Sequence, residues 1–148
     1  MDRLYLDDLT VGQLFVSATH TLHEADIIAF ATQFDPQPFH LDDAAARNTL
    51  FGGLAASGWH TAAIAMKLLV DSLPLAGGII GSGVELAWPR ATRPGDMLHL
   101  ETEIVSITSS RTKPDRGVVV ARTRTLTQTG DVVQVTTAKI LATRRPHP

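Results

Sequence analysis

The second half of the chain is dominated by runs in which apolar and polar side chains alternate. Over residues 97–108, Leu98, Leu100 and Ile104 alternate with charged or polar positions. A period of two is typical of a β-strand with one buried face and one solvated face. Turn-forming residues, such as Arg-Pro-Gly-Asp at 93–96, separate the runs. The pattern predicts four strands of an antiparallel meander, over residues 79–88, 97–108, 117–127 and 131–143.

The first half of the chain carries shorter and more varied signals. β-Branched and aromatic residues with loose alternation predict a strand over residues 12–22. Apolar residues recur at helical spacing over residues 23–34, which predicts an amphipathic helix that ends just before Asp35. Asp42 is a suitable N-cap for a short helix over residues 43–48.

A long segment over residues 54–73 is apolar or small on nearly every face. Its clearly polar residues, Lys67 and Asp71, lie near its end. A helix that is hydrophobic all round is a buried helix, and a half-solvated antiparallel sheet needs an apolar element to cover. We therefore expect an α+β fold, in which one antiparallel sheet wraps around a long buried central helix, in a single domain over residues 1–148.

Composition narrows the possible partners and chemistry. The chain has 148 residues, a formal net charge of -2 and no cysteine. This composition has no basic footprint for nucleic acid and no thiol for nucleophilic or metal-binding chemistry. The histidines show no metal-like spacing, and the first ten residues show no signal-peptide core. We expect a cytoplasmic protein without a metal and without a nucleic-acid or membrane partner.

Asp35 and His40 are the first candidates for chemistry. They lie five positions apart across a loop that Pro36 and Pro38 stiffen. A carboxylate and an imidazole that face one cleft can hold a water between them and exchange protons near neutral pH. The residues alone are equally compatible with a turn capped by Asp35 and a His40 that packs beside the short helix.

The glycines at 52 and 53 and the polar residues at the start of the long segment are further candidates. Unpaired backbone N–H groups at a helix amino terminus can donate to a developing oxyanion, although Gly52 and Gly53 also suit a simple turn. Within the segment we expect Ser57 to bond locally and keep Thr61 as a candidate site residue. A lone histidine such as His60 is more often a satisfied core group than a catalyst.

With these pieces placed, the chain resembles the MaoC-like hydratases, the R-specific enoyl-CoA hydratase group. Their signature is Asp, any residue, Asn, Pro, an apolar residue and His, followed by a glycine that opens the central helix. Here the corresponding stretch is Asp-Pro-Gln-Pro-Phe-His at 35–40, and the likeness extends over residues 12–141, including 88–96. The resemblance implies a hot-dog fold, a homodimer, and an acyl-CoA thioester as substrate with no further cofactor.

The resemblance also implies roles for individual residues. Asp35 and His40 would activate the water that adds to C3 of a 2-enoyl thioester and would move the C2 proton. The N–H of Gly53 would polarise the thioester carbonyl, and Thr61 falls where the family often has a supporting serine. Gln37 replaces the family's Asn with a longer amide. The remaining expected substrate-binding or supporting residues are Pro38, Phe39, Gly52, Trp59 and His60.

Two other functions are compatible with the same fold. A hot-dog thioesterase would also use a carboxylate and a helix amino terminus but would release free CoA. A non-catalytic acyl-thioester binding subunit would have little reason to keep both Asp35 and His40. Arg90 and Arg93 follow a strand end, where an arginine meets CoA phosphates or an acidic substrate, or more commonly is solvated.

Overall fold

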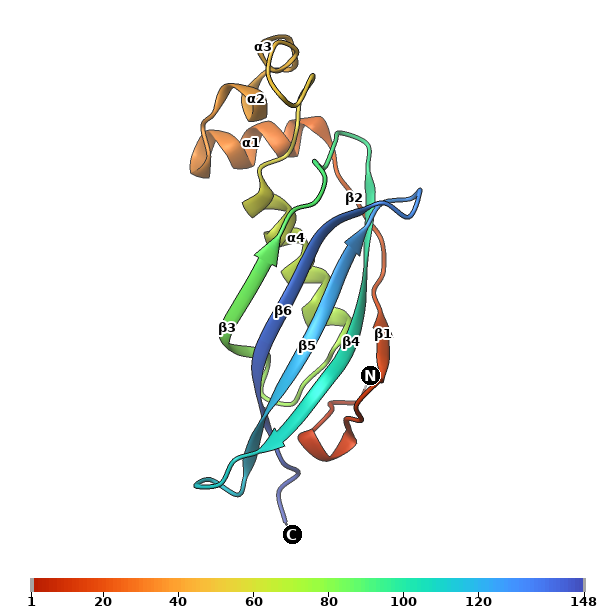
Figure 1. Ribbon diagram of the computed structural model, residues 1–148, viewed down its shortest axis with the longest axis vertical. Helices are drawn as coiled ribbons and strands as arrows, with labels where there is room; N and C mark the ends of the chain where they lie inside the picture. The colour runs from red at the N-terminus through yellow and green to blue at the C-terminus, as the bar shows by residue number, and fades with distance from the viewer. Residues whose placement is uncertain (1, 148) are drawn as a thin grey trace.

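The computed structural model describes residues 2–147 and contains one antiparallel sheet with helices on its concave side (Figure 1). The helices are η1 (Leu6–Asp8, a 3₁₀ helix), α1 (Glu24–Phe34), α2 (Pro38–Leu41), α3 (Asp43–Ala46) and α4 (Gly58–Ser72). The strands are β1 (Leu14–Val16), β2 (His20–Thr21), β3 (Ile80–Ala87), β4 (Met97–Ser109), β5 (Arg116–Leu126) and β6 (Val132–Thr143).

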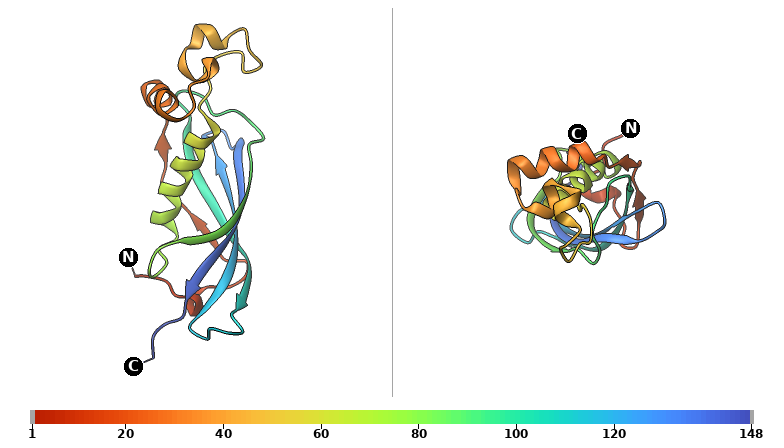
Figure 2. Two further views of the ribbon diagram at one scale, coloured as in Figure 1. Left: turned by 90° about the vertical axis from the view of Figure 1, so that its left-hand side faces the viewer. Right: turned by 90° about the horizontal axis from the view of Figure 1, so that it is seen from above.

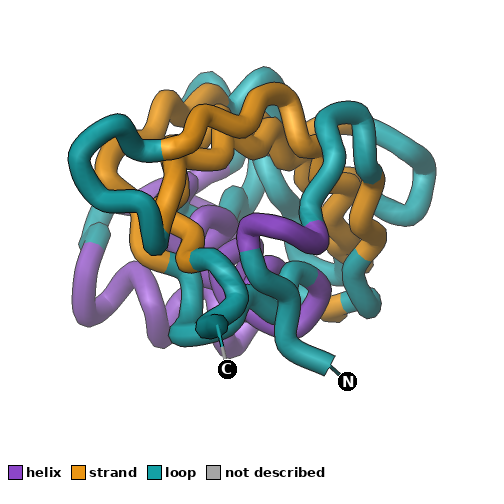
Figure 3. The backbone as a smooth tube through the Cα atoms, turned by 90° about the horizontal axis from the view of Figure 1, so that it is seen from below, coloured by secondary structure: helices purple, strands orange, loops and turns teal. Residues whose placement is uncertain are grey.

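The sheet has the strand order β1-β4-β5-β6-β3, and β2 also pairs with β4. Every pairing between these strands is antiparallel. The four strands expected in the second half are confirmed, each end lying within one residue of its predicted place. Seen along its length, the sheet arches over the helices (Figure 3). The expected α+β class, a sheet curved around a central helix, is therefore confirmed.

The central helix α4 packs along the concave face of the sheet (Figure 2). Its Ile64 and Leu68 join Leu98 and Leu100 of β4 in one buried cluster. Leu98 and Leu100 have no exposed surface, as their alternation with polar positions predicts. Burial of one such side chain contributes roughly 1.5–3 kcal/mol before entropy is counted, so this seam holds helix and sheet together.

The strand expected over residues 12–22 is wrong in its continuity, because the structure breaks it into β1 and β2. The break occurs at Ser17, whose N–H donates to the Leu100 carbonyl at 3.0 Å. The Ser17 hydroxyl oxygen then accepts the Leu100 N–H at 2.7 Å, where a neighbouring strand would offer a backbone carbonyl. A side-chain hydrogen bond thus replaces one backbone hydrogen bond between the strands, and the chain can bend at this point.

The long helix expected over residues 54–73 is also wrong at its start, because α4 begins at Gly58. The Ala55 N–H donates to the Phe39 carbonyl at 3.0 Å, and the Ala56 N–H donates to the Thr92 carbonyl at 2.9 Å. These bonds to distant segments hold the preceding residues extended. The Ser57 hydroxyl accepts the Trp59 N–H at 3.3 Å and so caps the helix.

The segment before α4 differs from expectation in two smaller respects. The loop expected at 35–40 contains the first residues of α2, which begins at Pro38, a position where proline costs no hydrogen bond. The short helix expected at 43–48 is α3, which ends at Ala46. Its expected N-cap is confirmed, since the Asp42 carboxylate accepts the Ala44 N–H at 3.2 Å.

No helix within residues 2–147 is both long enough and apolar enough to cross a membrane.

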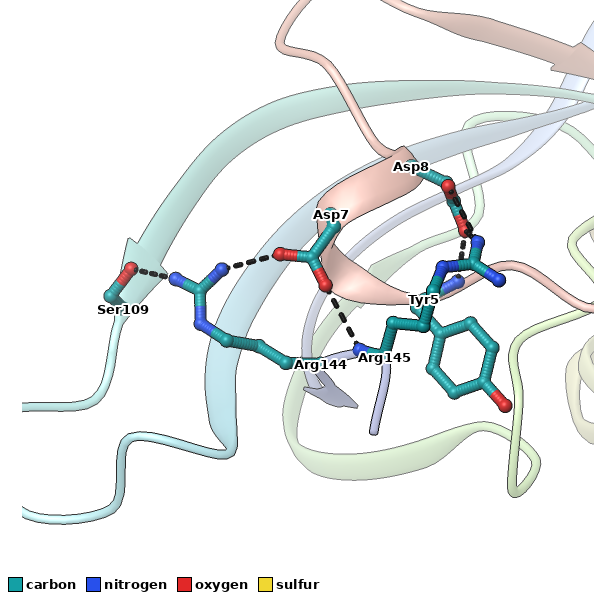
Figure 4. Close-up of polar contacts among 6 residues, drawn as sticks. All are labelled: Tyr5, Asp7, Asp8, Ser109, Arg144 and Arg145. Carbon is teal, nitrogen blue, oxygen red and sulfur yellow. Dashed lines mark hydrogen bonds and ion pairs between the residues drawn. The ribbon is translucent and has the colours of Figure 1, made fainter. Parts of the chain in front are cut away.

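Acidic residues of η1 hold the segment that directly follows β6 (Figure 4). Asp7 pairs with Arg144 at 2.6 Å, and Asp8 pairs with Arg145 at 2.7 Å. The Arg145 backbone N–H also donates to Asp7 at 2.9 Å, and the Arg145 guanidinium lies 4.7 Å from the centre of the Tyr5 ring. We call this group of contacts the terminal clamp.

The terminal clamp predicts a loss of stability in acid. The hydrogen bond from the Arg145 backbone lowers the pKa of Asp7, and the bond from the Tyr5 backbone lowers that of Asp8, both from an ordinary 3.8. A carboxyl whose folded pKa is depressed stabilises the fold above the unfolded pKa, and this contribution is lost as pH falls through the folded pKa. We therefore expect the Tm of the parent to approach that of an Asp7→Asn/Asp8→Asn variant as the pH is lowered from about 5. Thermal unfolding of both proteins at a series of pH values would measure this difference. A difference that stays constant with pH would contradict the clamp's contribution.

Candidate active site

Helices α1, α2 and α3 gather at the amino end of α4 (Figures 1 and 2). Asp35 is the C-cap of α1, and His40 lies in α2. A cavity of about 380 Å³ opens beside them. The expected site residues that line this cavity are Asp35, Gln37, Phe39, His40, Trp59 and Thr61. It is also lined by Phe51, Gly58, Trp88 and Thr92.

The structure brings Asp35 and His40 into direct contact. His40 Nε2 lies 3.3 Å from Asp35 Oδ2, and their side chains retain 6% and 16% of their exposure. His40 Nδ1 lies 2.6 Å from the Ala55 carbonyl oxygen. Because a carbonyl only accepts, Nδ1 must carry the proton. In a neutral His40, Nε2 is therefore unprotonated and faces Asp35. The contact between Nε2 and the carboxylate is favourable when one further proton lies between them.

Two hydrogen bonds keep Asp35 ionised. Burial raises the pKa of the Asp35 carboxyl, but hydrogen bonds from the Gln37 amide and the Ser57 hydroxyl, together with the charge of His40, outweigh it and leave the pKa below its usual value. The Gln37 amide nitrogen donates to Asp35 Oδ1 at 2.5 Å. The longer amide that distinguishes Gln37 from asparagine therefore still reaches the carboxylate.

Aromatic rings form one wall of the cavity. The edge of the Phe39 ring meets the His40 ring, with ring centres 4.6 Å apart and planes at 86°. Phe51 packs against Phe39 at 4.9 Å. On the other side Trp59 meets Trp88 edge to face at 5.2 Å. Apolar walls of this kind lower the local dielectric, which strengthens charge interactions beside them.

Thr61 lies in the cavity wall but is satisfied by the protein. It is buried, and its hydroxyl donates to the Thr92 hydroxyl at 3.1 Å. This bond ties α4 to the segment between β3 and β4. Thr61 thus lies where the sequence places a supporting residue, and its partner Thr92 is a residue that the sequence did not single out.

The residues that line the cavity do not include the expected Pro38, Gly52 and Gly53. Pro38 starts α2, and Gly52 occupies a turn at a φ of +65° that favours glycine. Gly53 lies five residues before the start of α4, so the expectation that it opens the helix is wrong. Its carbonyl accepts a bond from Arg93 at 3.0 Å.

His60 is a core residue in this structure. Its ring stacks on Phe30 with centres 4.7 Å apart and planes at 6°. Burial lowers the pKa of His60 and so favours its neutral form. Its Nδ1 is buried and has no partner among residues 2–147. The stacked ring agrees with a core position, but the unpartnered Nδ1 differs from the satisfied group that the sequence favours, and the residues that line the cavity do not include His60.

Gly58 is the residue of the site that sequence analysis missed. It is the first residue of α4 and lines the cavity beside Asp35 and His40. Within residues 2–147 its N–H finds no backbone or side-chain acceptor. A Cβ at this position would stand 2.5 Å from the Trp88 ring. The available signal was Ser57, a preferred N-cap residue directly before Gly58.

Within residues 2–147 no group of three or more histidine, cysteine, aspartate or glutamate side chains is placed to hold a metal ion.

A single antiparallel sheet curved around a central helix is the hot-dog fold. Residues 9–128 match the family model described as the MaoC like domain. The chain belongs to the MaoC-like dehydratase family.

Solved and curated relatives agree with this assignment. A MaoC-like dehydratase from Rhodospirillum rubrum is 61% identical, with a TM-score of 0.96 over 97% of this chain and 99% of that one. The unliganded R-hydratase PhaJ1 from Pseudomonas aeruginosa is 28% identical, with a TM-score of 0.76 over 97% of this chain and 88% of that one. A 3-hydroxybutyryl-CoA dehydratase from Methylorubrum extorquens is 30% identical over 109 residues, 73% of this chain and 68% of that protein.

Proposed function

We propose that the protein adds water reversibly to a 2-enoyl-CoA and so forms a 3-hydroxyacyl-CoA. The observation that carries this proposal is the contact of Asp35 Oδ2 with His40 Nε2 at 3.3 Å, in a cavity, with Nδ1 held by the Ala55 carbonyl. Membership of a family that includes hydratases and dehydratases supports the reaction class.

The pair suits a water addition in which every proton is accounted for. The ionised Asp35 takes one proton from a water whose oxygen bonds to C3. His40 enters this step with a proton on Nε2 as well as on Nδ1 and gives the Nε2 proton to C2, where the electrons of the C2–C3 double bond form the new C–H bond. The proton on Asp35 then returns to Nε2 across their contact. Dehydration follows the same steps in reverse, and the balance needs no redox or metal cofactor.

Gly58 is the proposed donor to the thioester oxygen, in place of Gly53. Negative charge develops on this oxygen as the enolate forms, and a backbone N–H at a helix amino end is a suitable partner. Gly58 lines the cavity and has an N–H free of acceptors within residues 2–147, whereas Gly53 is not among the residues that line the cavity. Removal of one such donor typically costs about 10²–10³ in kcat.

A second cavity favours an acyl chain without charge. It has a volume of about 520 Å³, lies between α4 and the strands β3 and β6, and shares Trp59 with the catalytic cavity. Its walls include Met66, Leu69 and Ile140 and contain no charged side chain. A distal carboxylate would lose its hydration there without a partner, which is strongly unfavourable. We therefore propose that the acyl chain is a hydrocarbon.

The test is a panel of 2-enoyl-CoA thioesters, beginning with crotonyl-CoA, incubated with the purified protein. Hydration removes the absorbance of the conjugated thioester and raises the mass by that of one water. A thiol reagent in the same assay reports any free CoA. Release of CoA without a hydrated product would identify a thioesterase, and binding without turnover would identify a non-catalytic subunit.

We also propose that the protein forms a homodimer through β3. This strand is at the edge of the sheet, so within residues 2–147 one row of its backbone groups is unpaired. Ile80 and Val84 on it are 57% and 64% exposed. An exposed edge with large apolar side chains is a template for pairing, and two copies can join it about a two-fold axis.

A charge on this edge should separate the proposed dimer. We expect the parent to sediment at about twice the chain mass of 15.9 kDa and a Val84→Lys variant to sediment as a monomer. A charged residue on an edge strand is a common means by which proteins prevent such pairing. Thr108→Lys, on an exposed position of β4, is the matched control and should sediment like the parent. A parent that is monomeric at all concentrations would contradict the proposal.

A further inference from the structure

Arg93 is engaged by three carbonyl groups of one irregular segment. Its guanidinium donates to the carbonyls of Phe51 at 2.5 Å, Gly53 at 3.0 Å and Leu54 at 3.3 Å. An arginine in this position was expected to be solvated or to meet an anionic ligand. Instead, its N–H groups donate to backbone carbonyls. These carbonyls lie outside helices and strands, so they have no partner from regular secondary structure.

The same segment ends at the group that holds the catalytic imidazole. The residue after Leu54 is Ala55, whose carbonyl accepts the His40 Nδ1 proton at 2.6 Å. Its first part carries Phe51, which lies 5.9 Å from the His40 ring. The guanidinium of Arg93 therefore fixes the backbone on which both of these contacts with His40 depend.

Arg93 is anchored through its own backbone, and Asp43 holds the segment from another side. Its backbone N–H donates to the Asp96 carboxylate at 2.8 Å, within the turn that precedes β4. On the other side Asp43 accepts the Leu54 N–H at 2.9 Å, and the charge of Arg93 helps to lower the pKa of Asp43. The segment is thus held by a cation on its carbonyls and by an anion on one of its amides, while both charges stay anchored in the fold.

We infer that Arg93 is a positioning residue that sets the orientation and tautomer of His40 through the Ala55 carbonyl. The catalytic consequence rests on the function proposed above, but the effect on His40 does not. A histidine nitrogen is protonated or free according to the partner of the other nitrogen, so the Ala55 carbonyl decides that Nε2 faces Asp35. If the Ala55 carbonyl moved, Nδ1 would lose its acceptor and His40 could adopt either tautomer.

The kinetic test compares Arg93→Lys with Arg116→Lys as a matched control. A lysine carries the charge but cannot reach three carbonyls with a rigid fork. We expect kcat for enoyl-CoA hydration to fall about 10- to 100-fold in Arg93→Lys, with KM changed much less, because misplaced groups cost this much even when the substrate binds. Arg116 is paired with the neighbouring Asp115 in a distant hairpin, and its variant should keep the parent kcat. A parent kcat in Arg93→Lys would overturn the inference.

Chemical rescue separates positioning from a general loss of structure. In an Arg93→Ala variant, guanidinium chloride below the denaturing range should raise kcat, whereas the same concentration of sodium chloride should not. A denaturant would only harm a variant whose defect is instability. Failure of guanidinium to raise kcat in a variant that is folded by circular dichroism would count against the inference.

The tautomer of His40 gives a readout that needs no activity. Nitrogen NMR of the six histidines at alkaline pH, with His40 assigned through a His40→Gln variant, should show a proton on Nδ1 in the parent. In Arg93→Lys the signal should move towards a mixture of the two tautomers, while Arg116→Lys matches the parent. An unchanged Nδ1 signal in Arg93→Lys would overturn the inference even if the parent proved inactive on every enoyl-CoA tested.

Discussion

Replacement of Asp35 by asparagine, or of His40 by glutamine, is expected to lower kcat for hydration of crotonyl-CoA about 10²- to 10⁴-fold. Each substitution keeps the size of the side chain but removes the group that accepts or donates a proton. In the proposed cycle one proton passes between the two residues across their 3.3 Å contact, so neither residue can complete the cycle alone. Steady-state kinetics by loss of the enoyl-thioester absorbance would measure the effect.

The double variant provides the sharper test. Residues that act as one unit give strongly non-additive losses, so Asp35→Asn/His40→Gln should be little worse than either single variant. Two losses that multiply would show that the residues act independently and would contradict the shared-proton scheme. Circular dichroism and Tm should first establish that each variant is folded, because His40 is buried and bonded to the Ala55 carbonyl.

Gly58→Ala is expected to destabilise the protein and to reduce its activity, although alanine is normally the better helix residue. Alanine gains roughly 0.5–1 kcal/mol over glycine in a helix. A Cβ here would lie 2.5–2.8 Å from three atoms of the Trp88 ring, and the indole is held by a 2.8 Å bond to Gln134. Overpacking of this kind costs roughly 1–3 kcal/mol, so after the helix gain we expect a net loss of up to about 2.5 kcal/mol in urea unfolding.

Gly53→Ala is the matched comparison for this prediction. A Cβ at Gly53 meets Asp43 Oδ1 at 3.4 Å and Arg93 at 3.8 Å, which is near ordinary contact. The unfolding free energy should therefore change less than in Gly58→Ala. If Gly58→Ala were as stable as the parent, the packing of Trp88 on the start of α4 would be looser than the structure shows.

The strands of the second half could be predicted because their information is local. In β4, alternation of Leu98, Leu100 and Ile104 with polar positions marks the buried face directly. The start of α4 could not be predicted in this way. Ala55 and Ala56 suit a helix by composition, but their N–H groups are taken by carbonyls of Phe39 and Thr92, which are distant in sequence.

The same distinction applies to the candidate site. Asp35 and His40 could be singled out because two titratable groups share a short, proline-stiffened stretch of sequence. Gly58 and Arg93 could not be placed, because their importance depends on contacts made across the fold. Gly58 adjoins Trp88, 30 positions away by the numbering, and Arg93 reaches the Phe51 carbonyl across 42 positions.

The terminal clamp has a consequence for the order in which the chain folds and unravels. The ion pair of Asp8 with Arg145 closes a loop of 137 positions. Ordering so long a loop is unfavourable until the strands between its ends have already paired. Contacts that form this late are absent from the transition state, so they leave the folding rate nearly unchanged and slow unfolding instead. We therefore expect Arg144 and Arg145, the two residues that follow β6, to lengthen the lifetime of the folded protein by slowing its unfolding.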